Sequence, residues 1–373
     1  MRATPEGTRR FAERLVEGGT VHPSAYAPDA CGRHASSLGL GTYLGDVDDA
    51  TDARYEAAVL EALTRGVNVL DTAINYRCQR SERAIGRALA RAFASGLASR
   101  DEIVVGSKVG YLAYDGAPPA HAGAWVHDAY VARGVFAAGE VVGGHHVLGA
   151  GYVRYAIDRS LENLGLDALD VEMLHNPETQ LDAVPRATLH ERLRASIEVL
   201  EEACSAGKVG VWGVATWDAL RLPPGDPHHL ALTEILALAR EVAGDAHHFR
   251  AVELPFGLAL PQALTRATQP LDGRLVTPLA AAARLGLTVW TSAPLHEGRL
   301  LTRALPPRFV EALGGLPTDA ARALHFTRST PGVGTTLFGT TSVAHLAENA
   351  APLGVPRADA AAWASLRQAL AAR

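Results

Sequence analysis

Cysteine is scarce in this chain: among 373 residues there are only three, at Cys31, Cys78 and Cys204, and no two of them form a CxxC pair. A disulfide framework is therefore not expected, and the reducing cytosol is the natural compartment. The charged N-terminus MRATPEGTRRFAERLVEGG has no apolar core of the kind that a signal peptide needs. We therefore expect a cytoplasmic protein.

An excess of one charge and long apolar runs are also missing. The formal net charge is −5, with no basic stripe, so we expect no nucleic-acid partner. No apolar run approaches the ~20 residues needed to cross a membrane. With 48% hydrophobic and 20% charged residues, the composition is that of a globular protein with length for one large core or two ordinary domains. The oligomeric state stays open.

A further absence concerns the fold. No strand-like run is followed by GxGxxG opening a helix, and the glycine cluster GLGLGTYLG leads into the acidic stretch DVDDATD, which argues against an open doubly wound sheet. Short β-branched runs instead alternate with amphipathic helices, as in parallel sheets buried on both faces. Eight such runs predict an α/β fold, a closed (β/α)8 TIM barrel. They lie at 38–45, 66–71, 102–108, 169–175, 208–216, 249–256, 287–293 and 335–339.

The helices between these runs show apolar residues at helical spacing. In SERAIGRALARAFASG, Ile85 and Leu89 share one face, and Ser81 is the expected N-cap. The helix RLRASIEVLEEACSAGK ends at Gly207, a residue type favoured just after a helix. Cys204 lies on the apolar stripe of that helix, so we expect it in the core.

The chain divides into an N-terminal extension (1–35), a barrel (36–352) and a C-terminal helix (353–373). Two inserts, 111–149 and 218–246, follow strand ends on the face where barrel enzymes build active sites from loops. The first contains Tyr111, Tyr114, Trp125, Tyr130 and Phe136, which either line a pocket or pack a small core of the insert.

Ionisable residues end three of the predicted strands, at Asp71, Lys108 and His175, and Tyr76 follows Asp71 closely. Each has an ordinary explanation alone: a cap, a surface charge, a loop aromatic or a core histidine. In a barrel, however, the C-terminal ends of the strands converge on one mouth, so the four are expected to meet.

Together the four side chains would form an acid–base site. A tyrosine with a pKa near ~10 is a weak acid at neutral pH, and a nearby ammonium lowers that pKa by stabilising the phenolate. A carboxylate would keep the lysine charged, and a neutral histidine would donate a hydrogen bond to a substrate oxygen. This set suits carbonyl reduction or alcohol oxidation, with hydride supplied by a cofactor.

At several separate places the chain resembles the aldo-keto reductases. The matching motifs are NVLDTA and SERAIGRAL, SKVG, SLENLGLDALDVEMLHNPE, SAGKVGVWGVAT, APLHEGRL and GTTSVAHLAEN. The resemblance implies a TIM-barrel oxidoreductase that uses NADP(H), with NAD(H) as the alternative. It also implies that Tyr76 is the general acid, that Lys108 lowers its pKa, that Asp71 pairs with Lys108 and that His175 orients the carbonyl.

The same resemblance implies a cofactor site. Thr340, Thr341 and Ser342 would donate to phosphate at a helix N-terminus, and Asn349 would contact adenine. The whole expected set is Thr42, Asn176, Ala215, Thr216, Glu253, Ser292, Pro294, Leu295, Gly298, Gly339, Thr340, Thr341, Ser342, His345 and Asn349. No lysine or arginine occurs in the GTTSVAHLAEN turn, although family members that favour NADP usually place one there.

The nicotinamide end departs from the family pattern. Ala215-Thr216 stands for a Ser-Asn pair, Glu253 for a glutamine, and Ser292 for the aromatic that stacks on the ring. Thr216 and Glu253 can still hydrogen-bond a carboxamide. The missing ring face would come from Trp217, Trp290 or Phe256.

Two other features have ordinary alternatives. The tyrosine loop is longer than the usual form, and its Arg77 is a solvated charge, a partner of cofactor phosphate or a binder of an anionic substrate group. Adjacent histidines such as His145-His146 point to opposite sides of an extended chain, and carboxylate or cysteine partners at ligand spacing are missing, so no metal site is expected.

Three functions follow from these patterns. The first is an NAD(P)H-dependent oxidoreductase acting on a small-molecule aldehyde, ketone or alcohol. The second, prompted by the altered nicotinamide contacts, is a catalytically silent cofactor-binding barrel that acts as a regulatory or partner-binding subunit. The third is a cofactor-independent isomerase or lyase using Lys108 or His175. The substrate itself is not encoded in any motif.

Overall fold

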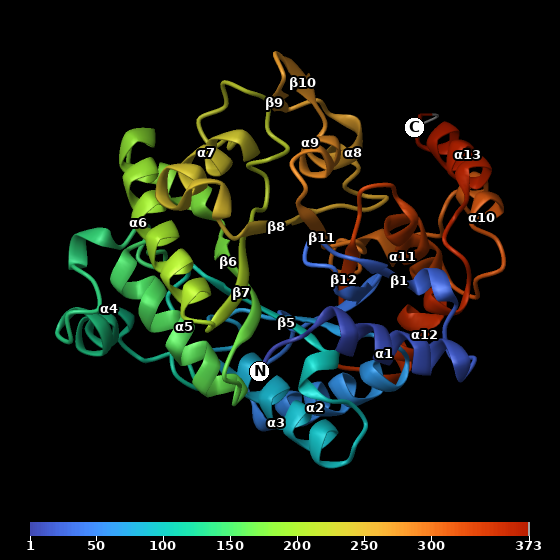
Figure 1. The fold of residues 1–373 in the computed structure, drawn as a ribbon, viewed down its shortest axis with the longest axis horizontal. Coiled ribbons are helices and arrows are strands. Elements are labelled where there is room, and N and C mark those ends of the chain that lie inside the picture. Colours follow the sequence, from blue (N-terminus) through green and yellow to red (C-terminus); the bar gives the residue numbers. More distant parts are fainter. Residues whose placement is uncertain (372–373) are drawn as a thin grey trace.

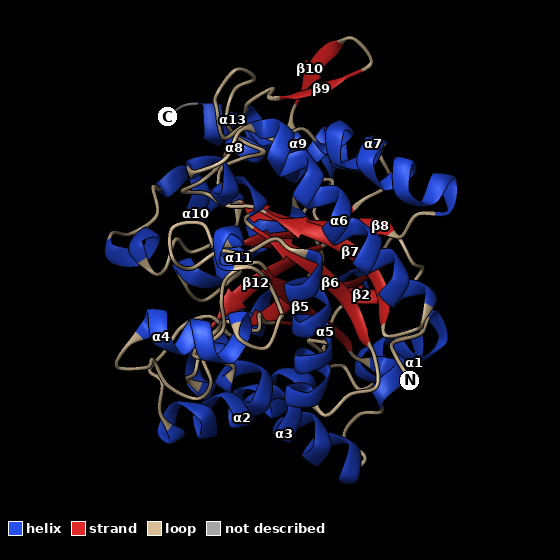
Figure 2. Cartoon of the chain, turned by 90° about the vertical axis from the view of Figure 1, so that its left-hand side faces the viewer, coloured by secondary structure: helices blue, strands red, loops and turns tan. Residues whose placement is uncertain are grey.

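Eight parallel strands close into a barrel in the computed structural model, which describes residues 1–371. Helices surround the strands on the outside (Figures 1 and 2). Around the barrel the order is β11-β12-β3-β4-β5-β6-β7-β8, and β11 pairs again with β8. The predicted α/β (β/α)8 barrel is confirmed. The barrel strands are β3 (Leu38–Gly41), β4 (Val69–Asp71), β5 (Val104–Val109), β6 (Leu169–His175), β7 (Val209–Ala215), β8 (Phe249–Pro255), β11 (Thr288–Ser292) and β12 (Thr335–Gly339).

The helices that follow the strands pack their apolar faces against the barrel. They are α2 (Asp49–Thr64), α3 (Arg80–Ala94), α5 (Ala150–Leu164), α6 (Arg186–Ser205), α7 (Leu232–Ala243), α9 (Pro278–Arg284), α11 (Asp319–Ser329) and α12 (Val343–Ala350). Ile85 and Leu89 are buried as predicted, and Gly207 adopts φ 76° just beyond α6. The predicted N-cap at Ser81 is wrong: Gln79 holds that position, and the Ser81 hydroxyl donates to the Thr42 carbonyl at 2.7 Å.

Additional elements decorate this frame. They are α1 (Pro5–Glu17), the hairpin β1 (Tyr26–Pro28) and β2 (His34–Ser36), α4 (Ala122–Val126), α8 (Gln262–Thr265), the hairpin β9 (Gln269–Leu271) and β10 (Arg274–Val276), α10 (Pro307–Ala312) and α13 (Ala360–Ala371). Much of the 218–246 segment is the regular helix α7, whereas 111–149 holds α4 and short helical turns.

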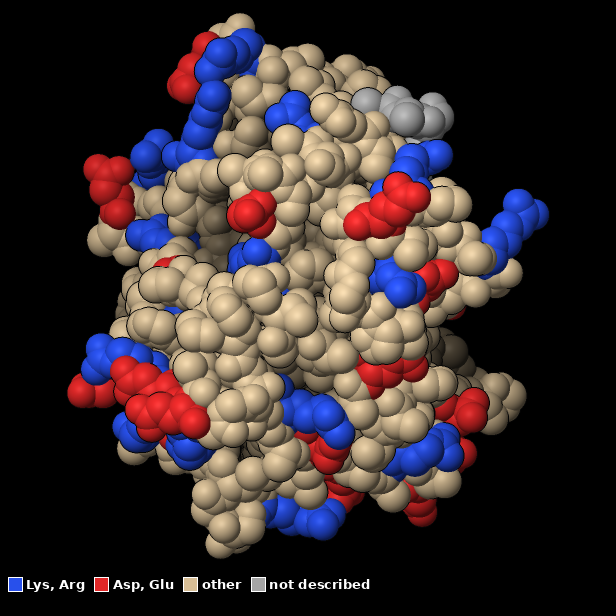
Figure 3. All heavy atoms as spheres, turned by 90° about the vertical axis from the view of Figure 1, so that its right-hand side faces the viewer, with Lys and Arg blue, Asp and Glu red and all other residues tan. Residues whose placement is uncertain are grey.

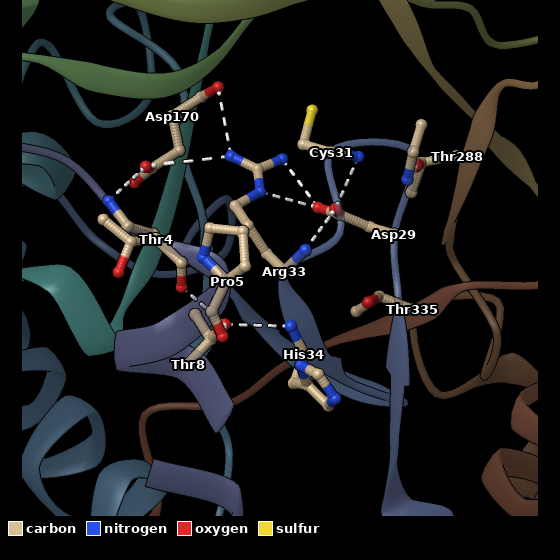
Figure 4. Close-up of polar contacts among 12 residues, drawn as sticks. Thr4, Pro5, Thr8, Asp29, Cys31, Arg33, His34, Asp170, Thr288 and Thr335 are labelled. Carbon is tan, nitrogen blue, oxygen red and sulfur yellow. Dashed lines mark hydrogen bonds and ion pairs between the residues drawn. The ribbon is translucent and has the colours of Figure 1, made fainter. Parts of the chain in front are cut away.

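The N-terminal segment packs against the end of the barrel where the strands begin, opposite the mouth; we call this the closed end (Figure 4). Arg33 is buried there between Asp29, at 2.7 Å, and Asp170, at 3.7 Å. The Ala3 amide donates to Asp170 at 2.7 Å, and the His34 amide donates to the Thr8 hydroxyl at 2.9 Å. These contacts tie α1 and the β1–β2 hairpin to β6.

Apolar side chains fill the barrel interior, except in the layer nearest its mouth. Val104, Val171, Met173 and Leu337 are buried in one cluster with Trp290, whose ring lies against Gly106. A Cβ atom at Gly106 would come within 2.6 Å of that ring, so glycine is required for the indole to fill the barrel.

The surface mixes charges of both signs. On the face in Figure 3, the lysine and arginine side chains are interspersed with aspartate and glutamate. Among the described residues, no helix is both long enough and apolar enough to cross a bilayer.

Candidate active site

The candidate site is the uppermost layer of the barrel interior. Side chains two residues apart on a strand point to the same face. Apolar interior positions at Val69, Met173 and Ala251 are therefore followed, one step toward the mouth, by Asp71, His175 and Glu253. Lys108 follows Gly106 on β5 in the same way. Strand periodicity thus places four polar side chains at one level.

Lys108 is the centre of this layer. Its Nζ atom lies 2.5 Å from Asp71 Oδ1 and 3.3 Å from Glu253 Oε2, and donates to the Thr72 carbonyl at 3.1 Å. The side chain is only 1% exposed, so these partners replace water. Burial lowers the pKa of Lys108, but attraction to Asp71, Glu253 and Tyr76 outweighs burial and raises it, so the ammonium stays charged.

Tyr76 lies between the lysine and the histidine. Lys108 Nζ is 5.2 Å from the centre of its ring, and the His175 ring meets it edge-on with centroids 5.8 Å apart. Asp71, Tyr76, Lys108 and His175 therefore meet at one site, as the sequence predicts. Burial of Tyr76 raises its pKa, and Lys108 offsets only part of that rise. Lys108 lowers this pKa as predicted, but desolvation of the phenolate outweighs the attraction of one ammonium that two carboxyl groups already share.

His175 is held as a neutral imidazole. Burial lowers its pKa far below the ordinary value, and the charges of Lys108 and His146 lower it further. Its Nδ1 atom is buried without a hydrogen-bond partner. A neutral histidine at this position can donate a hydrogen bond to a substrate oxygen without adding charge.

A cavity of about 880 Å³ opens above these side chains, and Asp71, Tyr76, His175 and Glu253 form part of its wall. Lys108 is not in the wall; it is buried behind the residues that are. Most of the predicted cofactor residues line this cavity: Asn176, Ala215, Thr216, Glu253, Ser292, Pro294, Leu295, Gly298, Gly339, Thr340, His345 and Asn349.

Three predicted cofactor residues do not line the cavity. Thr42 is fully buried, and its hydroxyl donates to the Asp71 carbonyl at 3.2 Å, so it supports the strand end. Ser342 is the N-cap of α12, with its Oγ atom 3.3 Å from the His345 amide. Thr341 lies between the cavity residue Thr340 and this cap.

The loop arginine Arg77 points away from the site. It is buried, pairs with Asp52 at 2.6 Å and donates to the carbonyl oxygens of Asp46 and Asp48 at 2.7 and 3.1 Å. Arg77 is not exposed and does not line the cavity, so the solvated charge, the partner of cofactor phosphate and the binder of a substrate anion all fail to describe it. The loop that follows Tyr76 is instead fixed by these contacts, and Arg77, Cys78 and Gln79 all adopt positive φ values of 49°, 57° and 69°. Such strain is tolerated where the surroundings hold it.

Of the proposed ring faces, only Trp217 reaches the cavity. Trp290 is packed inside the barrel, and Phe256 is buried against Phe326. The sequence missed Tyr43, which follows the end of β3, lines the cavity and contacts Tyr76 edge-on with centroids 5.1 Å apart. Its position two residues beyond the end of β3 was the available signal.

The insert 111–149 contributes one aromatic to the cavity, Tyr111, which also packs edge-on against His175 at 4.9 Å. Tyr130 and Phe136 are buried and stack at 5.3 Å, so they form the insert's own core with Tyr152. Within residues 1–371, no three His, Cys, Asp or Glu side chains converge in a way that could hold a metal ion.

The donor set of the cavity fits a nicotinamide nucleotide. Four of its lining residues carry buried polar atoms with no hydrogen-bond partner: Asn75 Oδ1, His175 Nδ1, Thr216 Oγ1 and Glu253 Oε2. Buried polar groups are normally paired, so such atoms mark positions that a polar ligand can satisfy. The cavity is within the range that small-molecule and cofactor sites occupy.

Comparison with known proteins agrees with this geometry. A model of the aldo/keto reductase family matches residues 37–223, and the chain belongs to this family of NAD(P)H-dependent oxidoreductases. An aldo-keto reductase from Klebsiella pneumoniae in complex with NADPH has the same fold, with a TM-score of 0.62, 22% identity, and coverage of 93% of this chain and 95% of that one.

Two curated proteins are similar in sequence. The 6-dehydroglucose reductase of Agrobacterium fabrum is 25% identical over 52% of this chain, and the match spans about half, 54%, of that protein. A protein of Schizosaccharomyces pombe named "Putative voltage-gated potassium channel subunit beta" is 24% identical over 85% of this chain and 84% of its own length.

Proposed function

We propose that the protein interconverts a carbonyl and an alcohol with a nicotinamide nucleotide, and that Tyr76 is the proton donor and acceptor. The observation that carries this proposal is the buried Lys108–Asp71 pair, 2.5 Å apart, beneath Tyr76 and beside a neutral His175 at the wall of one cavity. A structural ion pair alone would not need a phenol and an unpaired imidazole nitrogen at the same place.

The chain's own residues divide the chemistry among them. The bound nucleotide supplies or takes up hydride. During reduction Tyr76 transfers its hydroxyl proton to the substrate oxygen, and Lys108 stabilises the phenolate that remains. Asp71 keeps the ammonium charged and in place. His175 donates a hydrogen bond to the same oxygen and orients the carbonyl.

The cavity wall described above would hold the nucleotide. Asn176 and Thr216 offer hydrogen bonds near the acid–base residues. Thr340 and His345 lie at the start of α12, where a helix N-terminus attracts phosphate, and Asn349 lies at the end of that helix. NADP(H) is the expected form, because the Klebsiella pneumoniae protein similar to this chain holds NADPH.

NAD(H) is the alternative nucleotide, and the cavity gives a reason to compare the two. Among its described lining residues there is no lysine or arginine, and Glu297 and Glu348 are present. A ribose 2′-phosphate gains most from cationic partners. Fluorescence titration with NADPH and with NADH decides between the two forms.

The decisive experiment for the reaction compares the wild-type protein with Tyr76→Phe. The variant is expected to bind nucleotide with unchanged affinity and to lose about 100-fold or more of its reductase activity toward a panel of aromatic and aliphatic aldehydes and ketones. Normal turnover in the variant would exclude Tyr76 as the proton donor.

A second candidate is a catalytically silent barrel that binds nucleotide and acts as a regulatory or partner-binding subunit. The similarity to the protein named as a channel subunit favours it. Tight nucleotide binding with no turnover on the same panel would select this candidate. Failure to bind any nicotinamide nucleotide would bring forward a cofactor-independent isomerase or lyase.

Three sequence-based expectations stay as parts of this proposal: a cytoplasmic location, a small-molecule carbonyl or alcohol substrate without a nucleic-acid partner, and the division of the chain into an extension, a barrel and a C-terminal helix.

A further inference from the structure

Glu253 is a second carboxyl group at the Lys108 centre. It lies on β8, opposite Ala215 of β7 and Trp290 of β11, while Asp71 approaches the lysine from β4. Glu253 Oε2 is 3.3 Å from Lys108 Nζ, and the side chain is 8% exposed. Glu253 also lines the cavity. One buried ammonium is therefore shared by two carboxyl groups that reach it from different strands.

The charges at this centre do not balance if both carboxyl groups are ionised. One ammonium and two carboxylates leave one net negative charge in a place from which water is largely excluded, and an uncompensated buried charge is costly. His175 is neutral and Tyr76 is protonated, so neither removes the imbalance. One carboxyl group is expected to hold a proton.

The proton is placed on Glu253. Asp71 has the shorter contact with Lys108, 2.5 Å against 3.3 Å, and so gains more from the ammonium. Burial and the charge of Asp71 raise the pKa of Glu253 to about 8, although Lys108 counteracts them. Burial also raises the pKa of Asp71, but the nearer Lys108 ammonium counteracts this rise.

We propose that Glu253 is a positioning residue that controls, by sharing the Lys108 ammonium with Asp71, how strongly this cation stabilises the Tyr76 phenolate. The inference rests on the proposed role of Tyr76 as proton donor. In reduction, the Tyr76 O–H bond breaks and the substrate O–H bond forms, while Glu253 keeps its own proton. With Glu253 protonated, Lys108 is opposed by one carboxylate. With Glu253 ionised, a second negative charge opposes the phenolate, and reduction slows.

The sign of the pH effect follows. The reduction rate is expected to be highest while Glu253 is protonated and to fall to a lower plateau as the pH rises through the Glu253 titration. A drop of about tenfold corresponds to one pKa unit of interaction between the second carboxylate and the phenolate.

The first arm of the test measures the shared proton without any turnover. Carboxyl-13C glutamate NMR of the wild-type protein is compared with that of Glu253→Gln, which identifies the Glu253 resonance by its loss. The resonance is expected to titrate near pH 8, and to move to lower pH in Asp71→Asn because removal of that carboxylate frees the ammonium for Glu253. Titration near pH 4, or no response to Asp71→Asn, would overturn the proposal.

The second arm measures kcat/KM for reduction between pH 6 and pH 9.5. Glu253→Gln, which keeps the shape but not the titration, is expected to give a kcat/KM that no longer falls as the pH rises. The matched control is Glu178→Gln: Glu178 is also buried, and burial raises its pKa to about 7, but its oxygen accepts from the Trp217 amide at 3.0 Å rather than from Lys108. In this control, kcat/KM should still fall as the pH rises.

The two arms separate the two proposals. The positioning role would be overturned if kcat/KM of Glu253→Gln still fell with rising pH. It would also be overturned if this fall disappeared in Glu178→Gln instead. A further outcome is that Glu253 titrates as expected in the NMR experiment while Tyr76→Phe turns over normally. In that case Lys108 is shared by the two carboxyl groups, but Tyr76 is not the proton donor. The positioning role of Glu253, which depends on that donor, is then overturned as well.

Discussion

Two buried cations, Arg33 at the closed end of the barrel and Lys108 at its mouth, have different surroundings. Asp29 and Asp170 face Arg33, and their remaining oxygens accept from backbone amides, including Ala3 at 2.7 Å and Val105 at 2.8 Å. Lys108 has two carboxyl groups as well, but unpaired polar atoms of His175 and Thr216 lie on the same cavity wall.

The difference shows how one fold separates stability from chemistry. At the closed end every carboxylate of the pair has several donors, so the centre rigidly joins the N-terminal segment to β6. At the mouth, polar atoms of the cavity wall have no hydrogen-bond partner within the protein. These unpaired atoms destabilise the folded protein, but a bound ligand can satisfy them. Barrel enzymes in general place function at this face. Removing the cation at each end should therefore have opposite consequences.

The largest expected effect is on turnover in Lys108→Met. Without the ammonium, nothing stabilises the Tyr76 phenolate, and kcat/KM for reduction should fall by about 100- to 10,000-fold. Steady-state kinetics and a denaturation curve measured on the same preparation check this. An unfolded variant would show in the denaturation curve, and retention of more than a tenth of the activity in a folded variant contradicts the assignment.

Arg33→Met should give the reverse pattern. Loss of the guanidinium leaves the buried Asp29 without its ion-pair partner, whereas Asp170 keeps Arg100 at 2.9 Å. Breaking a buried pair in this way typically lowers the free energy of unfolding by about 3–5 kcal/mol. Urea denaturation measures the loss. Nucleotide affinity, measured well below the melting temperature, should not change; if affinity falls in parallel, the two ends are not independent.

Glu253→Gln should stabilise the protein in a pH-dependent way. The folded-state pKa of Glu253 is about 8, above the ~4.3 of an exposed glutamate, so the unfolded chain loses its proton at lower pH than the folded one. Wild-type stability should therefore fall as the pH rises from about 4.3 to 8. The glutamine variant should be more stable by about 1–3 kcal/mol at pH 8, with the gap closing toward pH 5. A constant gap across this range would contradict the raised pKa.

The smallest effect is expected at the cavity rim. Trp217 is 43% exposed and lines the cavity, so Trp217→Ala removes apolar contact with a substrate but little packing. For a ring-bearing probe such as 4-nitrobenzaldehyde, KM should rise about threefold to tenfold, with kcat and the melting temperature nearly unchanged. An aliphatic aldehyde of similar size is the control and should respond less. Equal KM changes for both probes would remove Trp217 from ring recognition.

Much of the barrel was predictable because burial on both faces leaves a clear trace in the sequence. The run at 335–339 coincides with β12, and the strands ending at Asp71 and His175 end where predicted. The interior layer then follows from the two-residue period of each strand. The prediction failed where a side chain binds a residue of a distant segment. Arg77 pairs with Asp52, and the Ser81 hydroxyl donates to the Thr42 carbonyl instead of capping its own helix.

The sequence alone determined the family, the alternation of strands and helices, and the level at which Asp71, Tyr76, Lys108 and His175 meet, because these depend on local periodicity and on residue types at strand ends. Only the tertiary structure decided the net shift of the Tyr76 pKa, the sharing of Lys108 with Glu253 and the exposure of Tyr43 at the cavity. These depend on desolvation and on distances across the barrel, and such quantities arise only when strands far apart in the chain close into a ring.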